Sequence, residues 1–115
     1  MEIKIRKNDD DLHLLELSGA LDLSSSEQLK QLVMKMIENK VERFIISLKD
    51  VDRINSSGIG ALIYISSTLK KLNSTLIMIV PEGPVMNALE VTRLKSYFTI
   101  APSLKEALKK GIRQF

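Results

Sequence analysis

The sequence predicts a single α/β domain, residues 1–115, with a mixed, mostly parallel β-sheet and about four helices. Short apolar runs typical of strands alternate along the chain with longer stretches in which apolar residues recur at helical spacing. Strands joined through helices form right-handed parallel crossovers, whereas two strands joined by a short polar turn form an antiparallel hairpin. The expected order of elements is therefore β-β-α-β-α-β-α-β-α.

Two strands and a helix open this order. Ile3 and Ile5 alternate with charged residues, as in a half-exposed strand, and His13–Gly19 form a second strand that is too apolar for a free edge. A polar turn joins the two strands. Helical spacing of apolar residues follows over Ser24–Lys40, where Ser24 and Glu27 have the spacing of a capping box.

The remaining elements continue the alternation. Near-continuous apolar runs predict strands covered on both faces, and periodic stretches predict helices between them. A proline suits the first turn of the third helix, and a second capping box and a glycine delimit the last helix. The predicted elements are a strand at Arg43–Leu48, a helix that follows residues 54–60, a strand at Thr75–Val80, a helix from Pro84, a strand at Tyr97–Ile100, and a helix from Ser103 to Gly111.

The composition excludes several classes of protein. Hydrophobic residues make up 44% of the chain and charged residues 27%, as in globular domains. No apolar run approaches the roughly 18 residues of a membrane-spanning helix, and the first residues lack the apolar stretch of a signal peptide. The absence of cysteine excludes disulfides, thiolate catalysis and cysteine-based zinc sites. We therefore expect a cytoplasmic protein without membrane attachment.

The net charge of +3 is unevenly distributed. Residues 1–57 hold 9 basic and 11 acidic side chains, whereas residues 58–115 hold 8 and 3. Nucleic-acid binding requires basic side chains gathered on one face with stacking aromatic rings. The basic residues of the second half lie mostly near predicted helix ends, where they favour the negative end of the helix dipole. The sequence thus favours solvated helix ends over a nucleic-acid interface.

Common catalytic, phosphate-binding and metal-binding motifs are missing: GxSxG, GxxxxGK[ST], GxGxxG and HExxH do not occur. The only histidine, His13, lies in a predicted strand, so serine catalysis would require it to reach Ser56 or Ser57. The carboxylates of residues 9–11 are consecutive and point in different directions, which favours a polar turn over a metal site. We expect no catalytic residue, no cofactor and no metal.

Residues 54–60, INSSGIG, lie where a buried strand gives way to a helix. Asn55, Ser56 or Ser57 can accept a hydrogen bond from the unpaired N–H groups of the first helical turn, which contributes about 1 kcal/mol. The same end of a helix attracts anions, so the fold would tolerate a phosphate on one of these serines. The charge of that phosphate, about −1.5 to −2, would change any partner surface built around it. The stretch is a candidate for both a helix cap and a phosphorylation switch.

Three segments resemble the STAS-domain family of anti-sigma factor antagonists: SGALD at Ser18–Asp22, VDRINSSGIGAL at Val51–Leu62 and SLKEAL at Ser103–Leu108. With the order of elements, the resemblance covers nearly the whole chain. Proteins of this family are small cytoplasmic domains that bind an anti-sigma factor, which is also a serine protein kinase, and so free a sigma factor for transcription. The resemblance implies a STAS domain over residues 1–115 that is not an enzyme.

The resemblance also implies roles for individual residues. In the family, the kinase phosphorylates the first serine of an Asp-Ser-Ser/Thr-Gly motif and switches the antagonist off, and a phosphoserine phosphatase restores it. By position, Ser56 is the acceptor, Ser57 is the neighbouring hydroxyl, and Gly58 allows close approach of the backbone. Asp22 matches an acidic residue that lies beside the acceptor and helps to engage the kinase.

Two positions depart from the family pattern. Asn55 replaces the Asp that precedes the acceptor, and Ser47 stands where the apolar strand of the family usually ends in an Asp. The loss of carboxylates near the acceptor lowers the local negative charge and so makes a phosphoserine easier to hold. The same loss also removes contacts with which a kinase orients the hydroxyl. Asn55 remains a good helix cap, so its replacement questions phosphorylation rather than the fold.

We expect a partner-binding surface around Ser56 in a protein that is a monomer or a weak dimer. Its helix positions are those that the apolar stripe leaves free. The alternatives are a scaffold of a large sensory assembly, an adaptor subunit of a transport complex without a working phospho-switch, and a small hydrolase that uses Ser56. The expected surface consists of Asp22, Leu23, Ser24, Asn55, Ser57, Gly58, Gly60, Ala61 and Tyr64.

Overall fold

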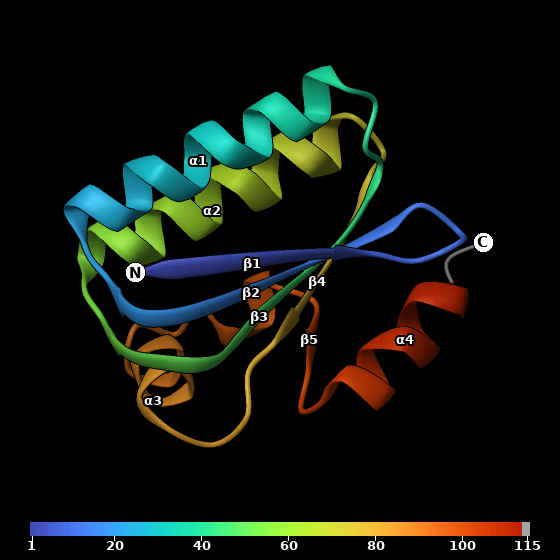
Figure 1. The fold of residues 1–115 in the computed structure, drawn as a ribbon. Helices are drawn as coiled ribbons and strands as arrows, with labels where there is room; N and C mark the ends of the chain where they lie inside the picture. Colours follow the sequence, from blue (N-terminus) through green and yellow to red (C-terminus); the bar gives the residue numbers. More distant parts are fainter. Residues whose placement is uncertain (114–115) are drawn as a thin grey trace.

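A five-stranded β-sheet with the strand order β1-β2-β3-β4-β5 forms the centre of the structure (Figure 1). The computed structural model describes residues 1–113 of the chain, and the side chains of residues 1–110. β1 is antiparallel to β2 and all other neighbours are parallel, which confirms the predicted mixed sheet. The elements are β1 (Glu2–Lys7), β2 (Leu12–Leu21), α1 (Leu23–Glu38), β3 (Arg43–Ile54), α2 (Ser56–Lys71), β4 (Thr75–Ile79), α3 (Pro84–Val91), a 3-10 turn (Lys95–Tyr97), β5 (Ile100–Ala101) and α4 (Leu104–Arg113).

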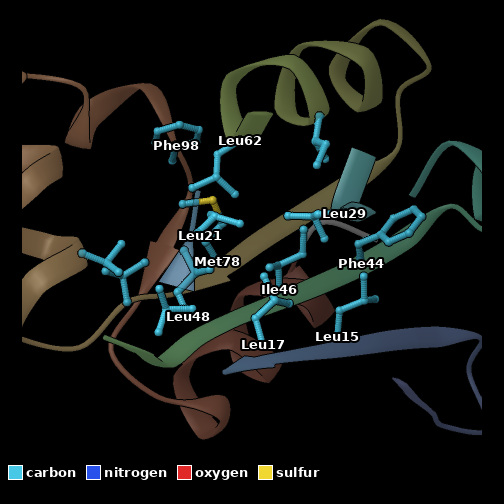
Figure 2. Packing of buried hydrophobic residues seen from close by; sticks show 14 of the residues in the cluster. Leu15, Leu17, Leu21, Leu29, Phe44, Ile46, Leu48, Leu62, Met78 and Phe98 are labelled. Carbon is cyan, nitrogen blue, oxygen red and sulfur yellow. The ribbon is translucent and has the colours of Figure 1, made fainter. Parts of the chain in front are cut away.

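Side chains of the central strands alternate between two apolar clusters. Helices α1 and α2 lie side by side against the sheet (Figure 1), and Leu29 of α1 and Leu62 of α2 belong to the same cluster as Phe44 of β3 (Figure 2). Ile45, the next residue of β3, belongs instead to a second cluster that includes Ala107 of α4. Helices cover both faces of the sheet, which explains the near-continuous apolar run in the first part of β3, at Arg43–Leu48.

Strand β3 is longer than the predicted strand, which ends at Leu48. It continues to Ile54 because β2 also extends, and the two strands pair in parallel until Leu21 lies opposite Ile54. Two register shifts give β3 extra residues relative to β2 in this part, and Val51, which is only 3% exposed, fixes it to the core. β4 pairs only with residues 43–47 of β3. Beyond that point, within residues 1–113, β2 is the only strand that pairs with β3.

The start of α1 differs from the prediction. The predicted capping box of Ser24 and Glu27 is wrong. Asp22 is the N-cap residue, and the reciprocal partner of its capping box is Ser25, the third residue of the helix. Serine takes the place of the usual Glu or Gln in this box, which explains why the pattern was not apparent from the sequence.

The C-terminal elements follow the predicted order with shifted boundaries. Instead of a strand at Tyr97–Ile100, the chain forms the 3-10 turn and then the short strand β5. The predicted cap of the last helix is confirmed on one side, because the Ser103 hydroxyl accepts a hydrogen bond from the N–H of Glu106 at 3.3 Å. α4 continues through Gly111, where the sequence predicts its end. None of the helices within residues 1–113 is long and apolar enough to cross a membrane.

The polar turn between β1 and β2 is organised by a side chain. Asn8 Oδ1 accepts hydrogen bonds from the N–H of Asp10 at 2.9 Å and of Leu12 at 3.0 Å. Asp11 adopts a left-handed conformation with φ 61°, which aspartate tolerates better than most residues. No three acidic or histidine side chains of the described residues are grouped so that they could hold a metal ion.

Candidate functional site

The first residues of α1 and α2 come together at one edge of the sheet. β2 and β3 are parallel and end opposite each other, with Leu21 paired to Ile54. Each strand is followed by one capping residue, Asp22 or Asn55, and then by its helix. The N–H of Asn55 donates a hydrogen bond to the carbonyl oxygen of Leu21 at 3.3 Å. We call residues 22–24 and 55–58 the docking corner.

Asn55 caps α2 as the sequence predicts. Its backbone is extended, with φ −112° and ψ −175°, and its Oδ1 accepts a hydrogen bond from the N–H of Gly58 at 3.2 Å. The N–H groups of Ser56 and Ser57 lie in the first helical turn and therefore have no intrahelical acceptor. This end of α2 presents unpaired donors and the positive end of the helix dipole.

Asp22 caps α1 through a reciprocal pair of hydrogen bonds. Its Oδ1 accepts from the N–H of Ser25 at 3.1 Å, and its own N–H donates to Ser25 Oγ at 2.8 Å. The Ser25 hydroxyl also lies 3.0 Å from Asp22 Oδ1 and 2.8 Å from the carbonyl oxygen of Ala20. These bonds fix the direction of the Asp22 carboxylate at the docking corner.

The same bonds lower the pKa of Asp22 below its ordinary value. The N–H of Ser25 is the largest cause and the Ser25 hydroxyl is the second, whereas the positive charge of the N-terminal ammonium contributes a smaller part and that of Arg53 the smallest. Asp22 is therefore ionised at neutral pH. The docking corner has a fixed negative charge next to the start of α2.

Gly58 allows α2 to begin directly against the end of β2. A Cβ atom at this position would lie 2.6 Å from the carbonyl oxygen of Leu21 and 2.8 Å from the Ile54 side chain. Main-chain atoms cannot move aside cheaply, so only glycine fits here. The close backbone approach that the resemblance implied for Gly58 is confirmed. By contrast, a Cβ at Gly60 would meet nothing within 4 Å.

The two serines of the stretch differ in accessibility. Ser56 is the first residue of α2 and is exposed, whereas Ser57 is half-buried. An enzyme that modifies a hydroxyl must reach it from solvent, so Ser56 is the better placed of the two. Its neighbours across the docking corner, Leu23 and Ser24, are also exposed, and Leu23 exposes 66% of its surface.

The α2 positions of the predicted partner surface differ in exposure. Gly60 is exposed, and Tyr64 exposes 51% of its surface. Ala61 is only 3% exposed, so its predicted place on the surface is wrong. The N-terminal end of α2 is held so close to β2 by Gly58 that the buried side of the helix also includes Ala61.

Residues of α1 that the sequence did not single out extend this surface. The Lys30 ammonium lies 5.4 Å from the centre of the Tyr64 ring and forms an ion pair with Glu27 at 2.8 Å. A shallow groove follows along the two helices. The position of this groove depends on how α1 and α2 are aligned. The spacing of residues within one helix does not show that alignment. The groove is lined by Glu27, Lys30, Gln31, Met34, Lys35, Glu38 and Tyr64.

Ser47, one of the two departures from the family pattern, does not end its strand. It is 8% exposed and lies in the middle of β3, opposite Glu16 of β2 and Ile79 of β4. The rest of β3 separates it from Asn55 along the chain. Asn55 is therefore the departure that lies directly at Ser56.

His13 lies at the opposite end of the sheet from the docking corner. It is paired with Phe44 near the start of β3, whereas Ser56 follows the end of that strand. Its Nδ1 lies 3.0 Å from the carbonyl oxygen of Asp11 in the β1–β2 turn. A serine–histidine pair between His13 and Ser56 is therefore excluded.

Known proteins share this architecture. A family model of the STAS domain matches residues 2–107. A candidate anti-sigma factor antagonist from Thermotoga maritima has a TM-score of 0.88 at 20% identity, over 96% of this chain and 95% of that chain. The anti-sigma factor antagonist SpoIIAA in its unphosphorylated form has a TM-score of 0.74 at 17% identity, over 99% and 100%.

A third solved structure carries an acidic replacement of a serine. It is a serine-to-glutamate variant of RsbS from Moorella thermoacetica, with a TM-score of 0.77 at 20% identity, over 98% of this chain and 97% of that chain. SpoIIAA of Bacillus is also similar in its phosphorylated form, with a TM-score of 0.72 at 17% identity, over 95% and 98%. At these identities the likeness establishes the shared fold alone.

Proposed function

This chain belongs to the STAS domain family, and we propose that it is an anti-sigma factor antagonist whose partner binding is switched off by phosphorylation of Ser56. The partner is an anti-sigma factor that is also a serine protein kinase, and its capture frees a sigma factor for transcription. A phosphoserine phosphatase restores the binding form. We place this exchange in the cytoplasm, with the chain acting as a binding module and not as an enzyme.

One observation supports this proposal above all: the exposed Ser56 is the first residue of a helix that begins beside the cap of α1. A phosphate on Ser56 would lie near the unpaired N–H groups and positive dipole end of α2, so the fold would tolerate it. A partner docked on the same corner would have to desolvate and accommodate about two negative charges. The modification would thus leave the fold intact while it weakens binding.

Asn55 keeps the cap but not the charge of the family's aspartate. The hydrogen bond that Asn55 Oδ1 accepts from the N–H of Gly58 is of the kind that an aspartate would also accept. What the asparagine cannot provide is a carboxylate for a kinase to bind next to the acceptor. We propose that the kinase engages the nearby Asp22 carboxylate instead, which is ionised and fixed in direction by Ser25.

The second candidate is a scaffold or adaptor role without a working phospho-switch, and the neutral Asn55 next to the acceptor favours it. The two candidates differ in assembly state. A scaffold of a sensory complex forms high-order oligomers in light scattering, whereas an antagonist is a monomer or a weak dimer. An adaptor would co-purify with a membrane transport protein.

The decisive experiment is partner capture followed by reconstitution. The tagged chain is used to isolate proteins from its native cell, and mass spectrometry identifies a kinase-like anti-sigma factor. The purified partner is then titrated with the parent chain and with Ser56→Glu in a calorimeter. Binding by the parent and weak binding by the variant support the proposal. Equal affinity of the two chains contradicts the switch.

A further inference from the structure

Arg53 is an exposed cationic residue three positions before Ser56 in the chain. It is the residue before Ile54, the last residue of β3, and it is exposed. Arg53 pairs with Ala20 of β2, directly after a register shift between Gly19 and Ala20. Such a bulge turns the following side chains relative to a regular strand. Ile54 packs against the core cluster, so by strand alternation Arg53 points away from that cluster.

Among the residues that the structure describes, none forms an ion pair with Arg53. Within the described part of the chain, no carboxylate oxygen lies within 4.0 Å of its guanidinium, whereas several other cations have such partners. Asp22 is close enough for Arg53 to help lower its pKa, but the two side chains form no ion pair within 4.0 Å, and Asp22 Oδ1 bonds Ser25. Two residues after Arg53, this chain has the neutral Asn55 in place of a carboxylate.

Arg53 and Ser56 are within reach of each other. Three residues of chain place their Cα atoms at most ~11 Å apart. A phosphoserine extends outward by a phosphate group with three acceptor oxygens, and arginine presents five N–H donors on a long side chain. Both side chains are exposed at the same edge of the sheet. This separation is short enough for the guanidinium to meet the phosphate of a phosphoserine and bind two of its oxygens.

These observations rest on the proposed function, and from them we propose that Arg53 binds the phosphoryl group on Ser56 and stabilises the switched-off form. Without the phosphate, Arg53 offsets part of the negative charge of Asp22. With it, the phosphate carries the larger charge and attracts the guanidinium, and Asp22 keeps its bonds to Ser25. Asn55 is then a favourable residue beside the acceptor, because an aspartate there would compete with the phosphate for Arg53.

The test uses chain in which phosphoserine is inserted at position 56 during translation, so that no kinase or partner is required. Phosphorus NMR follows the second ionisation of the phosphate, whose pKa is about 6 for a free phosphoserine. We compare the parent with Arg53→Gln and with Lys49→Gln, which removes the same charge from an exposed residue earlier in β3. Arg53→Lys keeps the charge but loses the two-point geometry.

We expect Arg53→Gln to raise the phosphate pKa by about half a unit or more, Lys49→Gln to leave it unchanged, and Arg53→Lys to lie between. Equal values for Arg53→Gln and the parent would overturn the proposal. If Arg53→Gln folds poorly, the Nε–H resonance of Arg53 in the parent gives a second measurement. It must shift when phosphoserine is present, and an unmoved resonance would also overturn the proposal. Calorimetry with the partner tests the proposed switch separately.

Discussion

The N–H of Asn55 donates a hydrogen bond to the carbonyl oxygen of Leu21 at 3.3 Å, and this bond joins the start of α2 to the end of β2. Gly58 makes the contact closer still, because it has no Cβ to meet the same carbonyl. The two halves of the docking corner are therefore held in one fixed arrangement. A partner that docks there meets a preformed surface, which lowers the entropy cost of binding.

Gly58→Ala should destabilise the domain. The new Cβ would lie 2.6 Å from the Leu21 carbonyl oxygen, and we expect the free energy of unfolding to fall by about 1–3 kcal/mol. Gly60→Ala is the matched control, because its Cβ meets nothing within 4 Å and alanine should stabilise the helix by up to about 1 kcal/mol. Urea denaturation measures both. A Gly58→Ala chain as stable as the parent would contradict the described contact.

Ser56→Glu should weaken binding to the cognate anti-sigma kinase at least tenfold, roughly 1.4 kcal/mol, because the charge must be desolvated in the interface. Its unfolding temperature should remain close to that of the parent, since an acidic residue suits the first turn of a helix. Ser96→Glu adds the same charge to an exposed residue of the 3-10 turn and should bind like the parent. Equal losses in the two variants would point to net charge as the cause, not to the corner.

Incubation with the kinase and ATP should place a single phosphate on Ser56, because Ser57 is half-buried. Mass spectrometry should find no phosphate on Ser56→Ala. Label on Ser57 alone would show that the acceptor was assigned wrongly. If the parent is not modified but Asn55→Asp is, then the kinase requires the missing carboxylate, and the native chain has lost or altered its switch.

Replacement of Asn55 separates its capping role from its place beside the acceptor. Asn55→Ala removes the bond to the N–H of Gly58, and we expect it to lower the free energy of unfolding by about 1 kcal/mol. Asn55→Asp keeps an oxygen at the same place and should be at least as stable as the parent at neutral pH. Thermal unfolding of both variants distinguishes them. If the two changes destabilise the chain equally, a capping oxygen at position 55 is not what stabilises the start of α2.

The lowered pKa of Asp22 predicts a dependence of stability on pH. Its carboxylate binds protons less readily in the folded chain, so its contribution is present above the ordinary Asp pKa and is lost as pH falls through the lower, folded value. Asp22→Asn should therefore unfold with a smaller decrease in Tm at acidic pH than the parent. Asp52→Asn removes an exposed carboxylate from β3 and is the control. A parent and an Asp22→Asn chain with the same acid profile would contradict the prediction.

The order of elements was predictable because hydrophobic period depends on local sequence, as at Arg43–Leu48. The extension of β3 to Ile54 was not, because its charged residues form a strand only through pairing with β2. The Asp22 cap was missed because Ser25 replaces the usual acidic partner. The burial of Ala61 was not predictable from the sequence, because the close approach at Gly58 sets which side of α2 is buried.

The candidate site was predictable to a different extent. The stretch at residues 54–60 indicated a strand followed by a capped helix, and the resemblance pointed to Ser56. The groove beside Tyr64 was not apparent, because the contact with Lys30 joins two helices whose alignment is set by packing on the sheet. The direction of Arg53 was not predictable either, since it depends on the bulge between β2 and β3.

The short pairing of β4 has a consequence for how this domain can diversify. β4 pairs with β3 only over residues 43–47. The docking corner therefore lies at the end of a two-stranded ribbon of β2 and β3, and β4, β5 and α4 do not extend along this ribbon. Helix α3 packs against β3, but additions at β5 or α4 lie outside that ribbon. Such additions can accumulate while the arrangement of residues 22–24 and 55–58 stays constant.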